Sequence, residues 1–197
     1  MKLQIIQVGE EVLRGQARDL SREEILSAAI QELIEEMRKT MRTAPGVGLA
    51  APQVGMPLQL AVIEDRKEYH AKLAAERLAE RQRKPIPFHV LINPRIVALA
   101  DETVEFFEGC LSVTGYAAVV PRARAVTVEF LDERAERRRV DGAGWYARIL
   151  QHEIDHLNGV LYVDRMRNRT FTTVENLERV WKELPTAEVL NRLKARR

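Results

Sequence analysis

The feature that most constrains the fold of this chain is the pattern His-Glu-x-x-His at residues 152–156. Two histidines four residues apart share one face of an α-helix, about one turn from each other, so both imidazoles can reach a single metal ion. Glu153 can then lie beside a water on that metal and take its proton. Apolar residues around the pattern and Asn158-Gly159 after it predict a helix that ends there. The alternative is a helix whose histidines face solvent or the core.

A third metal ligand must come from elsewhere in the chain. Catalytic zinc-type centres usually take three protein ligands and leave a fourth position open. The sequence contains one cysteine, Cys110, within Glu108-Gly109-Cys110-Leu111-Ser112. A thiolate with two imidazoles is a sensible donor set, although a lone cysteine is more commonly a small buried thiol. The histidine pattern is therefore what favours Cys110 as a ligand.

Length and composition indicate a soluble globular protein. A chain of 197 residues suits one domain, so we expect residues 1–197 to form a single catalytic domain with a surface insertion at 64–87 and a basic tail at 186–197. The net charge of +2 gives no case for a dedicated nucleic-acid binder. One cysteine excludes an internal disulfide. We expect a cytosolic location, most simply the bacterial cytosol, because no signal peptide and no membrane-spanning apolar run is seen.

The order of the segments predicts an α+β fold. Ser21-Arg22-Glu23-Glu24 is a capping box that opens a helix to about Arg42, with Leu26 on its apolar face. Many short strands, the histidine-bearing helix and two C-terminal helices at 174–183 and 187–194 follow. We therefore expect antiparallel strands packed around a central catalytic helix. The predicted strands are 58–63, 88–92, 96–100, 103–107, 116–120, 126–131 and 137–140, with a turn at Asn93-Pro94.

A segment rich in glycine and alanine, residues 46–55, separates the first helix from the first strand. Small residues let the backbone approach another group closely. The segment lacks the Lys-Ser/Thr ending and the G-x-G-x-x-G spacing of nucleotide-binding loops, so we do not predict phosphate binding. Taken alone, it is compatible with a plain turn.

Three stretches together resemble the peptide deformylase family, which removes the formyl group from the N-terminal formylmethionine of nascent chains and releases formate. They are Gly46-Val47-Gly48-Leu49-Ala50-Ala51-Pro52-Gln53, Glu108-Gly109-Cys110-Leu111-Ser112 and Gln151-His152-Glu153-Ile154-Asp155-His156-Leu157. The resemblance runs from about Ile5 to Phe171. The 64–87 insertion, Gly144-Trp145 and residues 169–172 look most like the subgroup that includes organellar, type 1A-like forms.

The resemblance implies a role for each of these residues. Glu153 is the implied general base and acid, and the Gln53 amide and the Leu111 backbone N–H are the implied donors to the oxyanion. One divalent metal ion is implied, usually Fe²⁺ in the family, with Zn²⁺, Ni²⁺ or Co²⁺ able to replace it. The implied metal ligands are Cys110, His152 and His156. The implied substrate-binding residues are Val47, Gly48, Phe106, Glu108, Gly109, Trp145 and Ile149.

Two departures from the family pattern concern the periphery of the site. Glu10-Glu11 stands where Asp-Pro is common, and Ala117 replaces a common arginine that grips the substrate backbone. The implied partners are formylmethionine nascent peptides, with a transient ribosome contact and no nucleic-acid or membrane partner.

Two other functions are compatible with the residues. One is a zinc endopeptidase that shares the histidine pattern and takes Glu175 or Glu178 as its third ligand. The other is a non-catalytic module in which a metal braces the fold, or a ribosome-associated factor that acts through the basic residues 191–197. Release of formate from a formylmethionine peptide distinguishes the enzyme from the binding module.

Overall fold

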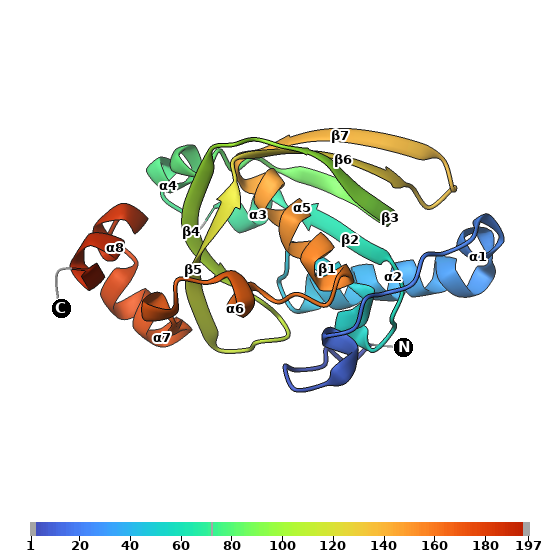
Figure 1. Cartoon of the computed structure of the whole chain (residues 1–197), viewed down its shortest axis with the longest axis horizontal. Coiled ribbons are helices and arrows are strands. Elements are labelled where there is room, and N and C mark those ends of the chain that lie inside the picture. Colours follow the sequence, from blue (N-terminus) through green and yellow to red (C-terminus); the bar gives the residue numbers. More distant parts are fainter. Residues whose placement is uncertain (1–2, 72, 195–197) are drawn as a thin grey trace.

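The computed structural model describes residues 3–71 and 73–194, which form two antiparallel sheets and several helices (Figure 1). The five-stranded sheet has the order β1-β2-β3-β6-β7, and the three-stranded sheet has the order β4-β5-β8. Every strand pair within them is antiparallel, so the predicted α+β fold class is confirmed. The strands are β1 Gly48–Ala50, β2 Leu60–Asp65, β3 Ile86–Leu99, β4 Thr103–Gly109, β5 Tyr116–Ala123, β6 Ala125–Leu131, β7 Arg137–Ala143 and β8 Thr172–Thr173.

The helices vary widely in length. No helix in the described part of the chain is both long and apolar enough to span a membrane. The α-helices are α1 Arg22–Leu26, α2 Ala28–Thr43, α3 Lys67–His70, α4 Ala75–Glu80, α5 Gly144–Leu157, α6 Tyr162–Arg165, α7 Val174–Asn176 and α8 Thr186–Lys194. Short 3-10 or π-helical turns are η1 Glu11–Leu13, η2 Ala51–Val54, η3 Asn168–Thr170 and η4 Leu177–Trp181.

Helix α5, which carries both histidines, lies between the two sheets (Figure 1). Strand β2 shows how the larger sheet is covered on both faces. Its residues Leu60 and Val62 pack into the cluster that contains α2, whereas Ala61 and Ile63 pack into the cluster that contains α5. This alternation follows from the two-residue period of a strand. The histidine pattern is therefore held by a buried helix.

The first long helix is interrupted, contrary to the prediction of one helix from Ser21 to about Arg42. The capping box at Ser21 is confirmed, but α1 ends at Leu26 and α2 begins at Ala28. Ser27 is extended (φ −68°, ψ 147°), and its hydroxyl accepts a hydrogen bond from the backbone N–H of Ile30. A serine can thus start a new helix instead of continuing the old one. The break leaves Leu26 exposed at 50%, outside the apolar face to which it was assigned.

The two strands predicted at 88–92 and 96–100 are a single strand, β3. The expected turn at Asn93-Pro94 is a bulge, where the register with β6 shifts between Ile92 and Arg95. Asn93 has a positive φ of 50°, and its side-chain amide bonds the backbone N–H and carbonyl of Leu20 at 2.9 and 2.8 Å. These bonds let the strand bend and continue.

The predicted surface insertion at 64–87 is solvated only in part. Strand β2 extends to Asp65, which is fully buried, and β3 begins at Ile86. The end of the insertion packs on α5: the backbone N–H of Trp145 donates to the carbonyl of Arg81 at 2.8 Å, and the guanidinium groups of Arg81 and Arg83 lie 5.2 and 4.9 Å from the Trp145 ring. This contact places the insertion next to the histidine helix.

The basic C-terminal segment is largely the helix α8, in which Val189 is fully buried against the small sheet and Arg192 bonds Glu188. The last residues of the predicted tail, 195–197, lie outside the described residues.

Candidate metal centre and active site

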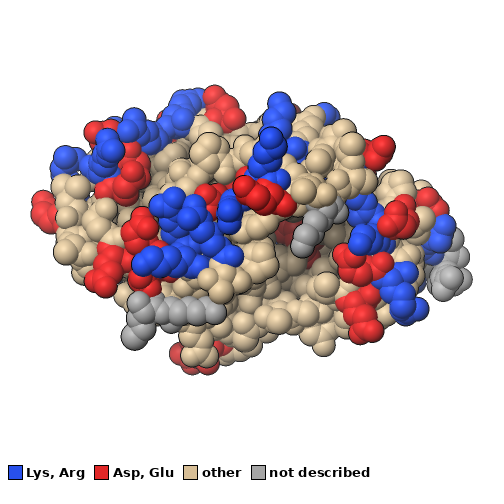
Figure 2. Space-filling model, turned by 180° about the vertical axis from the view of Figure 1, so that it is seen from behind, with Lys and Arg blue, Asp and Glu red and all other residues tan. Residues whose placement is uncertain are grey.

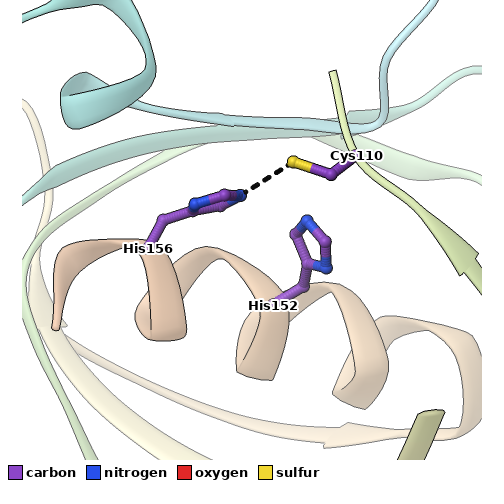
Figure 3. Close-up of side chains that lie close together, drawn as sticks. All are labelled: Cys110, His152 and His156. Atoms are coloured by element: carbon purple, nitrogen blue, oxygen red, sulfur yellow. Dashed lines mark hydrogen bonds between the residues drawn. The ribbon is translucent and has the colours of Figure 1, made fainter. Parts of the chain in front are cut away.

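Cys110, His152 and His156 converge at one point between the small sheet and α5. Their candidate donor atoms all lie within 4.8 Å of one another, and Sγ of Cys110 is 3.2 Å from Nε2 of His156. Figure 3 shows both imidazoles rising from one face of α5 and the thiol reaching them from the end of β4. A thiolate with two imidazoles suits a divalent transition metal and leaves a fourth coordination position open. The structure therefore brings together the three residues predicted as ligands, and the group can hold a metal ion.

Glu108 lies in a buried ion-pair network that orients His152. Its Oε2 is 3.1 Å from Nδ1 of His152 and accepts a hydrogen bond from Nη2 of Arg122 at 3.0 Å, while its Oε1 accepts from Nε of Arg122 at 3.0 Å. Nη1 of Arg148 donates to Oε1 at 2.5 Å. Burial would raise the pKa of Glu108, but the hydrogen bonds and positive charges of His152 and Arg122 hold it well below its ordinary value. With Nδ1 donating to this carboxylate, Nε2 of His152 is left for a metal.

Glu153 is buried directly beside Gly48. The side chain is 3% exposed, and its Oε2 has no hydrogen-bond partner among the described residues. A Cβ at position 48 would lie 2.1 Å from Oε1 of Glu153, so only glycine leaves room for this carboxylate. Burial raises the pKa of Glu153 to about 7. A carboxyl with an unused oxygen and a pKa near neutrality is suited to exchanging a proton.

Two hydrogen-bond donors lie close to the metal group. The buried Gln53 accepts from the backbone N–H of Ala50 at 2.9 Å, and this bond turns its Nε2 toward Cys110 Sγ at 3.5 Å and Ser112 Oγ at 3.2 Å. The backbone N–H of Leu111 donates to no group in the described part of the chain. Ser112, which sequence reasoning did not single out, is fully buried and anchors the Gln53 amide.

A cavity of about 560 Å³ adjoins the metal group. Phe106 is not among the residues that line it, because the guanidinium groups of Arg81 and Arg148 lie over the Phe106 ring at 5.1 and 5.3 Å. Phe107 and Arg148 line the cavity instead. The other predicted site residues that line it are Val47, Gly48, Gln53, Glu108, Gly109, Cys110, Leu111, Trp145, Ile149, His152 and Glu153.

Arg148 could have been found from the sequence, because it lies four residues before His152 and therefore on the same face of α5. Trp145, Ile149 and Glu153 form the neighbouring row at the same spacing. Glu108 was predicted to bind substrate, yet its carboxylate is engaged by protein side chains. Its geometry is that of a group that positions His152.

Neither glutamate of the endopeptidase alternative joins the metal group. The group that the described residues form around the two histidines contains Cys110 and neither Glu175 nor Glu178. Glu178 instead pairs with Lys182 at 2.7 Å. The geometry therefore offers no support for a glutamate as third ligand.

The sequence matches the family model for polypeptide deformylase over residues 2–172. This chain belongs to the peptide deformylase family. Peptide deformylase 1A, chloroplastic, of Solanum lycopersicum is 51% identical over 174 residues, which cover 88% of this chain and 63% of the tomato protein. Peptide deformylase 1A, chloroplastic/mitochondrial, of Arabidopsis thaliana is 46% identical over 185 residues, 94% of this chain and 67% of that protein. The predicted likeness to organellar deformylases is confirmed by these relatives.

A solved structure of the family has the same fold. The class I type b peptide deformylase from Acinetobacter baumannii with Met-Ala-Ser bound has a TM-score of 0.75 and 32% identity, and the match covers 84% of this chain and 99% of that chain. The metal group, the buried Glu153 and the cavity thus occur in a fold shared with peptide deformylases, a family of metal-dependent enzymes.

Proposed function

We propose that this chain hydrolyses the formamide of N-terminal formylmethionine in nascent polypeptides and releases formate. The observation that carries the proposal is the convergence of Cys110, His152 and His156 beside a buried Glu153 whose Oε2 has no partner among the described residues, next to a cavity that Cys110, His152 and Glu153 line. The Acinetobacter relative binds Met-Ala-Ser. That tripeptide is what remains when the formyl group leaves formyl-Met-Ala-Ser, so the relative supports the same substrate class here.

Cys110, His152 and His156 would hold the metal ion. When bound, the metal supplies Lewis-acid chemistry, since it polarises the formyl carbonyl and lowers the pKa of water from about 15.7 toward about 7. We propose Fe²⁺ as the native ion, with Zn²⁺, Ni²⁺ and Co²⁺ as possible replacements, because thiolate and imidazole donors accept all of these ions.

The side chains around the metal group have separate roles in proton transfer, in stabilising the oxyanion and in binding the peptide. Glu153 takes a proton from the attacking water at its free Oε2 and delivers it to the departing amine. Charge builds on the formyl oxygen, where Gln53 Nε2 and the Leu111 N–H donate to it. One such donor is typically worth about 3–4 kcal/mol of the barrier. The Gly48 and Gly109 backbones bind the peptide, and Val47, Trp145 and Ile149 provide apolar walls for the methionine side chain.

The compartment and the peripheral contacts remain predictions. The plant relatives are named chloroplastic or chloroplastic/mitochondrial, so the cytosolic location expected from the sequence stays a prediction. The single-domain organisation of residues 1–197 and a transient ribosome contact are likewise proposals.

The direct test is formate release from formyl-Met-Ala-Ser by protein purified without oxygen, with metal analysis of the same sample. We expect one divalent ion per chain and steady release of formate, and activity that fades faster in air when the ion is iron, as metal and thiolate oxidise. Cys110→Ser should lose both metal and activity. A metal-loaded protein that releases no formate, or that cuts internal peptide bonds instead, would refute the proposal.

Gly48→Ala is expected to reduce kcat about 100-fold while the protein stays folded and metal-loaded. The added Cβ would meet the Glu153 carboxylate at 2.1 Å, so that carboxylate must shift, and a displacement of about 1 Å can cost about 100-fold in rate. Formate release and metal content measure the effect. Gly15→Ala is the matched control, because the nearest atom to a Cβ there is 4.0 Å away. Equal rates in both variants would show that the contact with Gly48 does not place Glu153.

A further inference from the structure

A second cavity, of about 270 Å³, continues from the one beside the metal group. It passes the edge of β4, which pairs with β5 on one side and with no other strand of the described sheets. It then reaches the face of the small sheet that packs against the C-terminal helices, where Phe107 and Ala117 line it. The residues that line both cavities are Arg83, Phe107, Glu108, Gly109 and Val174. A chain that leaves the metal site along β4 therefore meets this second cavity, which we call the downstream groove.

Two helical segments wall the downstream groove. Arg77 and Glu80 of α4, with Leu73 before the helix and Arg81 just after it, come from the insertion. Leu177, Trp181 and Lys182 face them from the C-terminal segment. In Figure 1, α4 lies at the upper left of β4, and the helices α7 and α8 lie below it at the left of β4 and β5. Figure 2 shows the face hollowed beside the C-terminal lobe, at the right, with charged side chains of both signs at its border.

Two guanidinium groups of the downstream groove have no carboxylate partner within the described ranges, those of Arg77 and Arg81. Arg81 lies between the rings of Phe106 and Trp145, at 5.1 and 5.2 Å. Burial, aided by the charge of Arg148, lowers the pKa of Arg81 to about 10, so it stays protonated at neutral pH.

The remaining charges of the groove largely cancel. Arg83 pairs with Asp65 at 2.7 Å, and Lys182 pairs with Glu178 at the same distance. Glu80 offsets one of the two free guanidinium groups. The groove is therefore left with a net positive charge next to apolar surface from Trp181.

We propose that the downstream groove binds the part of the nascent peptide that follows its first residues, and that Arg77 and Arg81 favour acidic side chains there. The inference rests on the proposed deformylase function, because it takes the occupant to be the same substrate. An extended peptide advances about 3.3 Å per residue, so its later residues pass from the metal-site cavity into the groove. Complementary charge then adds to binding and to the rate of encounter.

The test compares two amidated pentapeptides, formyl-Met-Ala-Ser-Asp-Asp and formyl-Met-Ala-Ser-Lys-Lys. We expect kcat/KM for the acidic peptide to be about fivefold higher at low salt, the size typical of exposed ion pairs, and the ratio to approach one at about 0.5 M salt. Arg77→Glu should bring the ratio to one or below. Arg137→Glu makes the same charge change on the exposed β7, away from the groove, and should keep the wild-type ratio.

The outcomes separate the two proposals. Release of formate from formyl-Met-Ala tests the function alone, and its absence would overturn both. Release from that dipeptide together with a pentapeptide ratio near one, unchanged by Arg77→Glu, would overturn the downstream groove only. Arg77→Gln removes the charge at similar length and gives the same test should the glutamate variant fail to fold. A ratio that changes equally in Arg137→Glu would assign the preference to overall charge and likewise contradict the proposal.

Discussion

Replacing Glu153 by glutamine should leave the metal bound and reduce kcat by about 10²–10⁴-fold, the usual contribution of a general acid–base group. Oε2 of Glu153 has no partner in the described part of the protein, and burial raises the pKa of this carboxyl to about 7. An amide can neither accept the proton of the attacking water nor deliver it to the amine. Formate release and metal content, measured on the same preparation, report the effect.

Glutamine is chosen because its side chain has nearly the same volume as that of glutamate, so the backbone around Gly48 is not displaced. Glu153→Asp tests whether the position of the carboxylate matters, since it retains the carboxylate but withdraws it by one methylene. We expect it to recover part of the lost rate. A glutamine variant with near-normal turnover would exclude Glu153 as the proton carrier, and a variant that loses its metal would assign it a role in building the centre.

Glu108→Gln should lower the free energy of unfolding by about 3–5 kcal/mol and weaken metal binding. Breaking a buried ion pair leaves an uncompensated charge, which accounts for costs of this size. Glu108 is 5% exposed, and it receives hydrogen bonds from both Arg122 and Arg148. It also fixes Nδ1 of His152, and loss of such a partner typically costs 10–100-fold in metal affinity. Denaturant unfolding of the metal-free proteins separates the first effect from the second.

The stability difference should depend on pH in a defined direction. Because the folded pKa of Glu108 is depressed, its contribution is fully present above the unfolded value of about 4.3 and is lost as pH falls through the folded pKa. The difference in unfolding free energy between wild type and Glu108→Gln is therefore complete at pH 7 and narrows below about pH 4. Glu102→Gln, which breaks an exposed pair with Arg124, is the control and should cost less than about 1 kcal/mol. Equal losses of unfolding free energy in the two variants would contradict a stabilising role for the buried network around Glu108.

Local patterns predicted the parts of this structure that depend on local chemistry. The histidine pattern with its apolar neighbours gave the position and end of α5, because a helix period of 3.6 residues fixes which side chains share a face. The capping box at Ser21 placed the start of α1 for a similar reason. Cys110 was favoured only because it is the one cysteine and the histidine pattern needs a third ligand, since nothing local brings a thiol just after β4 to the histidines, of which the first lies 42 residues later.

What sequence reasoning missed depends on partners that are distant in the chain. A serine at position 27 is compatible with a continuous helix, and only the structure shows that its side chain caps the start of α2. Asn93 bends β3 because its amide finds the Leu20 backbone. The contacts of Glu108 with Arg122 and Arg148 were not predicted, because those arginines lie on other elements. The insertion appeared solvated for the same reason, since Trp145, which covers its end, lies on α5.

The three candidate ligands lie on parts of the protein that are enclosed to different degrees. The histidines are carried by a helix enclosed between two sheets, so separating the imidazoles requires those sheets to part. Cys110 follows the last residue of β4, which forms an edge of the described small sheet, so a local opening of that edge would expose its thiol without parting the sheets. A chelator or an oxidant would therefore attack the centre from its sulfur side. His152 and His156 would keep their positions on α5, so a metal ion could bind there again.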